Sequence, residues 1–540
     1  MSDSGVRQNE GSRSALTTNE VRADDTDTTA KRFRPTSRQI IVISVGLLSL
    51  GLSLSQLATP EILSSYDTGV YLAAAIHFIS GVMPYRDFTF VQPPGIVLLM
   101  TPAAVFGRIF GTHDAFELVR VIGALFTALN VSLLAWIVRR RGTVAMVIAG
   151  VGLALSPVAF WVSSSLTLEP FCIFFVLVGT AIVFARDDED ATAKYLAVAG
   201  VFFGIAGAVK LWAVFPFIAL VICLTPRYRK RIAAFVAGAA ASFVVICLPF
   251  FLSAPSNFVS QVLTEQLLRK APSYEAASIL NRLVVLTGFQ PTTSAPTTLE
   301  ALIAFIVLGL VVLLAFRHRL AHASTDYFFL ITAVISVIAL LSTREFFFYY
   351  GYFSAPFLWA IAGISLARLR LPLQQRLAVL SIRHSLRRLF AFVSGAIGAV
   401  FLFAMILYVS SFYSNYAFAL GVYGPWLAQV AEYVPAGSCV VYADVSYGVY
   451  ANRFFTNDPR CPNVVDPYGM WMKFGYQVTP PTQTFANEWR TTFNRAQYVV
   501  LSNPNDFNIP WTKGLHTYFN DHFHQVFGKN YVYIYRRDAA

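Results

Sequence analysis

The stretch IAAFVAGAAASFVVICLPFFL, residues 232–252, contains no charged side chain, and the basic run RYRKR at 227–231 stands directly before it. A helix needs about 20 apolar residues to cross a bilayer, so this stretch predicts a membrane span with a basic flank. Similar runs occur along most of the chain. We expect eleven spans, at about 39–57, 116–138, 143–163, 167–185, 194–208, 211–225, 232–252, 298–316, 326–342, 347–366 and 389–411.

The composition agrees with a membrane protein. Hydrophobic residues make up 56% of the 540 residues and charged residues only 13%, against about 25% charged in soluble domains. The net charge is +12, but the basic residues cluster at the ends of apolar runs, which argues against nucleic-acid binding. Five cysteines are too few for a disulfide scaffold and lack metal-site spacing.

The distribution of basic residues predicts the orientation. With a cytoplasmic N-terminus, the inside segments hold 24 Lys and Arg residues and the outside connections before residue 412 hold 7. Residues 1–38 are polar and are expected to be a disordered cytoplasmic tail without a cleavable signal. The chain is thus expected to be a multi-pass protein of the plasma membrane.

The expected fold is a polytopic α-helical membrane domain, residues 39–411, with outer loops 58–115 and 253–297. Within the first loop, 68–80 and 95–110 suit helices that lie in the interface, because proline and charge interrupt them. Residues 412–540 are expected to form an extracytoplasmic α/β domain. Its expected strands are Cys439–Ala443, Tyr498–Ser502 and Tyr531–Tyr535, and its expected helices are 424–434, 485–494 and 514–526.

The first outer loop carries the most informative polar residues, within YDTGVY at 66–71, PYRDF at 84–88 and PPG at 93–95. Asp67 and Tyr71 are four residues apart and share one helix face. Asp87 follows beside Arg86. Two carboxylates at the outer membrane surface offer a general base for an acceptor hydroxyl. The alternative is that Asp67 only caps a helix and that Asp87 only pairs with Arg86.

Three further polar residues reach the same outer boundary from other spans. Glu169 opens the fourth span after Leu168, and its alternative role is an N-terminal charge favoured by the helix dipole. Lys210 lies in a turn between two short spans, where it either meets an anion or snorkels to the interface. Arg344 follows span nine, and its alternative role is pairing with Glu345.

In this order the motifs PYRDF, PPG, LEP at 168–170 and AVK at 208–210 resemble the GT-C class of integral-membrane glycosyltransferases. The resemblance covers about residues 39–366 and is greatest to the branch of protein O-mannosyltransferases and aminoarabinose-lipid transferases. It implies a polyprenyl-phosphate sugar donor, transfer on the extracytoplasmic face and inversion at the anomeric carbon. Many family members have two adjacent acids where this chain has Asp67-Thr68.

The resemblance implies roles for individual residues. Asp67 matches the general base and Glu169 the acid of the second outer loop, and the division of labour between Asp67 and Asp87 stays open. The expected contacts of the donor phosphate are Lys210, Arg344 and Arg86, and the expected substrate contacts are Tyr71, Tyr85, Tyr349 and Tyr350. The acceptor is a glycan, lipid or protein hydroxyl in the cell envelope. Asp67 and Glu169 could together hold a divalent metal, although two carboxylates alone are a weak signal for one. No other cofactor is expected.

Two other functions remain open. A transporter or flippase of lipid-linked saccharide would place its ionisable residues near mid-membrane in broken helices, whereas Asp67, Asp87 and Glu169 fall outside the spans. A non-catalytic assembly protein would use the aromatic-rich outer domain to bind glycan. In that domain Cys439 and Cys461 are expected to form a disulfide, because the compartment allows one.

Overall fold

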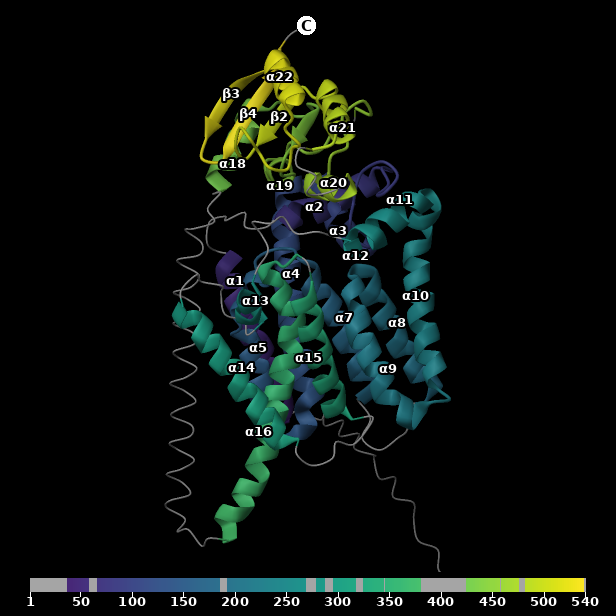
Figure 1. Ribbon diagram of the computed structural model, residues 1–540, viewed down its shortest axis with the longest axis vertical. Coiled ribbons are helices and arrows are strands. Elements are labelled where there is room, and N and C mark those ends of the chain that lie inside the picture. The colour runs from purple at the N-terminus through teal and green to yellow at the C-terminus, as the bar shows by residue number, and fades with distance from the viewer. Residues whose placement is uncertain are drawn as a thin grey trace, which may run out of the picture. The chain divides into compact units, whose positions relative to one another are not determined.

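The computed structural model describes residues 36–57, 66–184, 192–268, 278–286, 295–316, 324–343, 345–379, 424–456, 458–474 and 481–538 (Figure 1). Residues Ser37–Ala540 form one compact unit. The expected tail lies almost wholly outside the described residues, as does the expected span 389–411.

Long apolar helices make up the membrane domain, as the apolar runs predict. They are α1 (Ser37–Leu57), α4 (Thr112–Ile137), α5 (Thr143–Ala154), α6 (Pro157–Ser163), α7 (Leu168–Phe184), α8 (Ala193–Val209), α9 (Val214–Tyr228), α10 (Ile232–Ser253), α14 (Ala295–Ala315), α15 (Thr325–Ser342) and α16 (Gly351–Val379). Short 3-10 turns, η1 (Val138–Arg141), η2 (Leu211–Ala213) and η4 (Phe348–Tyr350), join some of them. In the described part of the chain, six helices are long and apolar enough to cross a membrane, or seven if one bent pair counts as a span. That all eleven expected runs cross stays a prediction.

The expected continuous span 143–163 is wrong in one respect. It is broken into α5 and α6, which meet at an angle of 56°. Pro157 stands at the break and has no N–H to donate, so the helix cannot continue through it. Ser163 then ends α6, and α7 begins shortly afterwards at Leu168.

Three segments that were expected on the cytoplasmic side meet at one end of the helices. Asp326 at the start of α15 is fully buried and accepts hydrogen bonds from Arg141 Nε at 2.6 Å and Arg368 Nη2 at 2.6 Å. Two guanidinium groups therefore neutralise one buried carboxylate, which a buried charge requires. This contact ties η1, α15 and α16 together on the side opposite the outer-loop acids.

The first outer loop contains the two expected helices, α2 (Tyr66–Ile79) and α3 (Gly95–Phe110). Most of α2 is buried, so it is part of the core rather than a helix lying in the interface. The glycine of the PPG motif has a packing role: a Cβ on Gly95 would lie 2.5 Å from the backbone oxygen of Ala208. Only glycine allows α3 to approach the end of α8 this closely, two residues before Lys210.

The second outer loop forms α11 (Pro255–Val259), the π-turn η3 (Ser260–Thr264), α12 (Glu265–Leu268) and α13 (Ile279–Leu286).

The C-terminal part contains a four-stranded sheet in the order β1-β2-β4-β3 (Figure 1). Its strands are β1 (Val440–Tyr442), β2 (Tyr498–Leu501), β3 (Phe523–Lys529) and β4 (Val532–Arg537), and its helices are α18 (Gly424–Tyr433), α19 (Ser446–Tyr450), α20 (Pro467–Lys473), α21 (Gln483–Asn494) and α22 (Lys513–His522). β1 and β2 are parallel, and the other pairs are antiparallel. The expected helix 514–526 is too long, because β3 begins at Phe523. β3 forms an antiparallel hairpin with β4 and is an edge strand of the sheet.

The C-terminal domain packs tightly on α2, which lies beside α19 and α20 in Figure 1. A Cβ on Gly69 would lie 2.5 Å from the backbone nitrogen of Ser446, so the glycine permits direct contact between α2 and α19. Thr112 at the start of α4 adds a hydrogen bond from its hydroxyl to Val449 O at 2.6 Å. The loop helix α2 is therefore held between the membrane helices and the sheet domain.

Candidate active site

A cavity of about 490 Å³ lies where α2, the outer ends of the membrane helices and the C-terminal domain meet. We call it the Asp67 cavity. Its lining residues are Tyr66, Asp67, Val70, Tyr71, Val91, Gln92, Trp161, Glu169, Lys210, Phe347, Phe348, Tyr349, Tyr350, Asp444, Asp466, Tyr468, Met472, Ser502, Asp506, Phe507 and Asn508. Six of the residues singled out in the sequence are among them: Asp67, Tyr71, Glu169, Lys210, Tyr349 and Tyr350.

Asp67 lies in the first turn of α2, with Tyr71 one turn further along the same face. Burial, together with the nearby Glu169 carboxylate, raises the pKa of the Asp67 carboxyl to about 7. The Lys210 ammonium and a hydrogen bond from Tyr349 act in the opposite direction. A carboxyl with a pKa near 7 can both accept and release a proton at neutral pH, which general-base catalysis requires.

Glu169 and Lys210 form a buried ion pair in the cavity wall. Glu169 is fully buried in the first turn of α7, and the Lys210 ammonium donates to its Oε1. Lys210 follows α8 in an extended conformation, which turns its side chain out of the helix. The other oxygen, Oε2 of Glu169, is buried and has no hydrogen-bond partner in the described part of the chain. Lys210 therefore meets an anion and does not snorkel.

Aromatic rings form the apolar side of the cavity. Trp161 of α6 stacks on Tyr349, with ring centroids 5.4 Å apart and an interplanar angle of 4°. The Lys210 ammonium lies 4.0 Å from the ring centroid of Trp212 and 4.7 Å from that of Tyr350. Aromatic faces attract cations, so these rings help to retain the ammonium in a poorly solvated place.

Three carboxylates of the C-terminal domain line the cavity and were missed in the sequence: Asp444, Asp466 and Asp506. Asp444 follows β1, and Asp506 lies in the loop after β2. Ligands of sheets commonly bind beyond the carboxyl ends of parallel strands. Polar residues directly after the apolar strands VVY and YVVL were the available signal. Burial raises the pKa of Asp444 to about 6.

The structure does not bring Asp87, Arg86 or Tyr85 to the Asp67 cavity. Arg86 Nη2 donates to Asp87 Oδ2 at 2.7 Å, and the same oxygen accepts from Met83 N at 2.7 Å. PYRDF is therefore a turn closed by its own arginine and aspartate, and this pairing lowers the pKa of Asp87. These three residues line a separate cavity of about 320 Å³ against α21. Arg344 lies outside the described residues.

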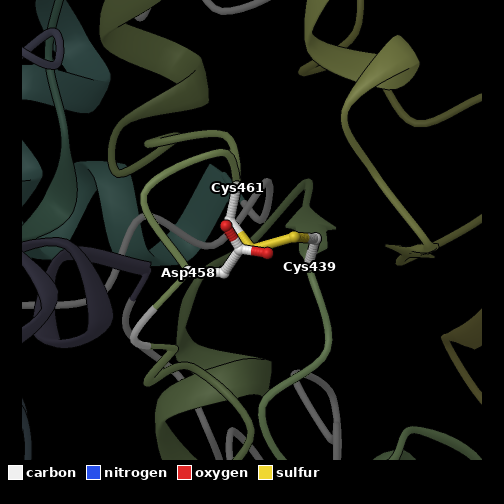
Figure 2. A group of neighbouring side chains, drawn as sticks. All are labelled: Cys439, Asp458 and Cys461. Carbon is white, nitrogen blue, oxygen red and sulfur yellow. A yellow bond between two sulfur atoms is a disulfide. The ribbon is translucent and has the colours of Figure 1, made fainter.

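The expected disulfide joins Cys439 and Cys461, whose Cα atoms are 4.9 Å apart (Figure 2). Together with Asp458 they place three potential metal-ligand atoms within 4.8 Å of one another. A disulfide sulfur is not the thiolate that binds metal, and Asp458 pairs with Arg460 at 2.7 Å. This group is therefore structural rather than a metal centre.

Comparison with known proteins agrees with this picture. The family described as Glycosyltransferase family 87 matches residues 90–343. ArnT from Cupriavidus metallidurans, in a crystal structure with bound undecaprenyl phosphate, superposes with a TM-score of 0.58 at 17% identity, over 93% of this chain and 98% of that one. The oligosaccharyltransferase of Archaeoglobus fulgidus, tethered to an acceptor peptide, superposes with a TM-score of 0.51 at 13% identity, over 93% of this chain and 74% of that one.

Among curated proteins, no sequence matches the chain. At these identities the two solved structures establish a common fold, and the family match covers residues on both sides of Glu169 and Lys210. The expected resemblance to the membrane glycosyltransferases of the GT-C class is therefore confirmed.

Proposed function

We propose that the chain transfers a sugar from a polyprenyl-phosphate donor to an acceptor hydroxyl in the Asp67 cavity. The observation that carries the proposal is the joint presence in one cavity of a carboxyl with a pKa of about 7 and a buried lysine ammonium. The bound undecaprenyl phosphate of the ArnT structure supports this class of donor.

In the proposed reaction, Asp67 takes the proton from the acceptor hydroxyl. The oxygen attacks the anomeric carbon from the side opposite the phosphate, so the configuration inverts. The polyprenyl phosphate leaves with the bonding electron pair and needs no proton donor. Tyr349, which hydrogen-bonds Asp67, and Tyr71 would hold the carboxylate in the orientation that proton transfer needs.

Lys210 would stabilise the negative charge that grows on the leaving phosphate. Glu169 has two effects in this scheme: it holds the ammonium in position, and its charge raises the pKa of Asp67. The stacked rings of Trp161 and Tyr349 add an apolar wall to the cavity that Lys210 also lines. A polyprenyl phosphate needs a cation for its phosphate and an apolar surface for its lipid chain, and the cavity offers both.

We also propose that the reaction needs no divalent metal. A metal on Asp67 and Glu169 would lie close to the Lys210 ammonium, which is bound to Glu169 Oε1, and the two cations would repel each other. Transfer by the purified protein should therefore persist after treatment with a chelator. Loss of transfer on chelation, with recovery on adding Mg²⁺ or Mn²⁺, would contradict this part of the proposal.

The proposed location is the outer face of the plasma membrane, with a role in cell-envelope glycan or glycoprotein synthesis. Two features support it. The basic residues concentrate in segments on the other side, and the Cys439–Cys461 disulfide belongs in an oxidising compartment. The Asp67 cavity would then open where a translocated lipid-linked sugar is presented.

The test is an assay of the purified full-length chain in lipid nanodiscs with a panel of polyprenyl-phosphate sugars. We expect release of polyprenyl phosphate together with a glycosylated acceptor. A transporter would move the donor across a sealed vesicle without cleaving it, and an assembly protein would bind glycan without either change. Cleavage coupled to acceptor glycosylation therefore separates the three functions.

A further inference from the structure

The C-terminal domain contributes its own group of residues to the Asp67 cavity. They come from two neighbouring segments: Asp444 directly after β1, and the 502–508 loop directly after β2, which includes Ser502, Asp506, Phe507 and Asn508. β1 and β2 are parallel, with Tyr442 paired to Val500, so both segments leave the sheet at the same edge. The carboxyl edge of parallel strands is the usual ligand-binding edge of such sheets.

The 502–508 loop is built around the Asp506 carboxylate. Asp506 Oδ2 accepts from the Ser502 backbone nitrogen at 2.9 Å and from its hydroxyl at 2.5 Å, and Oδ1 accepts from Asn508 N at 3.0 Å. These bonds close the loop on itself. They fix Ser502 and Asn508 before any ligand arrives, which lowers the entropy that binding would otherwise lose.

Asn508 supplies an independent sign of a ligand. The residue is only 5% exposed, and its Nδ2 donates to Ala443 O at 2.9 Å. Its Oδ1 is buried and has no hydrogen-bond donor in the described part of the chain, although the residue lines the cavity. A buried acceptor without a donor is unfavourable, so this oxygen is suited to a donor from a bound molecule.

Phe507 lies between Asp506 and Asn508 in the loop, and the residue is 57% exposed. An exposed aromatic ring beside fixed carboxylates is the chemistry that recognises a sugar ring. The apolar C–H face of the sugar packs on the aromatic face, while its hydroxyl groups donate to carboxylate and amide oxygens. Asp444, which accepts from Ser446 N at 2.9 Å, provides a second carboxylate on this edge.

The charges in the cavity indicate whether the bound sugar is neutral or anionic. Among the described lining residues, five carboxylates (Asp67, Glu169, Asp444, Asp466 and Asp506) face a single cation, Lys210, which Glu169 already pairs. An anionic sugar at the C-terminal edge would meet the carboxylates of Asp444 and Asp506 and no cation among the described lining residues there. Like-charge repulsion therefore favours a neutral, hydroxyl-rich ring at that edge and leaves the phosphate-bearing donor to the Lys210 side.

We propose that Asp444 and the 502–508 loop form a carbohydrate-binding subsite that holds the neutral sugar ring of the acceptor. The ring is held so that one of its free hydroxyl groups points toward Asp67. The subsite rests on the proposed function in that the bound sugar is the acceptor of the transfer. The acceptor is thus a glycan or glycolipid that ends in a neutral sugar, rather than a peptide side chain.

The direct test is binding of simple glycosides to the purified full-length chain in nanodiscs, by saturation-transfer difference NMR. The probes are the methyl glycosides of mannose, glucose, galactose and arabinose, with methyl glucuronoside as the anionic match. We expect millimolar binding of at least one neutral glycoside and none of the glucuronoside. Absence of binding by every neutral glycoside, or equal binding of the glucuronoside, would overturn the proposal.

Two variants locate the site. Phe507→Ala changes an exposed side chain, and Asp444→Asn removes one charge at nearly constant shape. Each should weaken glycoside binding at least tenfold, whereas Trp426→Ala should not, since Trp426 is an exposed aromatic of α18 outside the cavity. Unchanged binding in Phe507→Ala and Asp444→Asn would place the sugar elsewhere.

Kinetics and binding together separate this proposal from the proposed function. In a transfer assay Phe507→Ala should raise KM for the acceptor and leave KM for the donor unchanged; a rise in donor KM alone would overturn the acceptor assignment. If wild-type protein bound neutral glycosides through Phe507 but transferred no sugar, the subsite would stand and the transferase proposal would fail. Asp67→Asn protein should lose transfer and still show saturation transfer to a neutral glycoside, because the ring contacts at Phe507 and Asp444 remain.

Discussion

The Tyr66 hydroxyl donates to Asp466 Oδ1 at 2.9 Å and accepts from the Tyr468 backbone nitrogen at 3.0 Å. Tyr66 directly precedes Asp67 at the start of α2, and Asp466 begins α20 of the C-terminal domain. The residue next to the proposed base is thus fixed by a domain about 400 positions later in the chain. The C-terminal domain therefore helps to set the position of Asp67.

The contact between Tyr66 and Asp466 predicts that a change at Tyr66, the residue before the proposed base, slows catalysis. Tyr66→Phe removes the hydroxyl and both bonds, and should lower kcat by up to about 10²-fold while donor KM changes little, since a small displacement of the base slows proton transfer. Tyr433→Phe is the matched control, because Tyr433 lies on α18 outside the cavity. Unchanged kcat in Tyr66→Phe would mean that Asp67 is positioned without the C-terminal domain.

The pKa of Asp67 predicts the pH dependence of transfer. The base must be unprotonated, and its pKa is raised to about 7, so kcat/KM should rise with pH through about 7 and then level off. The Glu169 charge raises this pKa, so Glu169→Gln should move the midpoint to lower pH. A midpoint near pH 4 in the wild-type protein, or an upward shift in Glu169→Gln, would show that another group limits the rate.

Lys210 is the proposed partner of the leaving phosphate. Lys210→Ala should lower kcat by about 10²–10³-fold, as removal of one donor to a developing oxyanion does, and Lys210→Arg should keep part of the activity. Because Lys210 lowers the pKa of Asp67, the alanine variant should also shift the pH midpoint upward. Arg86→Ala is the comparison, since Arg86 lines the other cavity. Equal losses in Lys210→Ala and Arg86→Ala would contradict the assignment.

The apolar helices of the membrane domain were predictable because bilayer thickness sets the length of apolar runs, but the expected continuous span 143–163 missed the break before Pro157. The expected helix 514–526 failed at its end because the edge strand β3 is specified by pairing with β4, not by its own pattern. Tertiary contacts override local preference in such edge strands.

The site was predictable only in part. Asp67, Glu169 and Lys210 were recognisable as polar residues at the ends of apolar segments that were expected to face outward. The structure brings all three into one cavity. The sequence does show Arg86 next to Asp87, yet only the turn geometry reveals that the pair closes on itself. Asp466 has a local role as the N-cap of α20, and nothing near it in the chain indicates its contact with Tyr66.

Topology is the remaining structural prediction. A reporter that is active only outside the cytoplasm should be active when fused after residue 412 and silent when fused near Arg229, because the basic flank of α10 holds that loop inside. A fusion after Arg141 provides a second expected inside position, since three consecutive arginines, Arg139, Arg140 and Arg141, flank the span there. Equal reporter activity at residues 412 and 229 would contradict the span count and orientation.

The central claim is that Asp67 is the base and Asp87 is not, and one comparison tests it most directly. Asp67→Asn and Asp87→Asn proteins, purified in nanodiscs and shown to be folded by their thermal unfolding, are assayed with the donor that the wild-type protein uses. The amide at position 67 cannot take the proton, so transfer should fall by about 10²–10⁴-fold, whereas Asp87→Asn should stay within a few-fold of wild type. Near-normal turnover by Asp67→Asn, with loss in Asp87→Asn, would contradict the account.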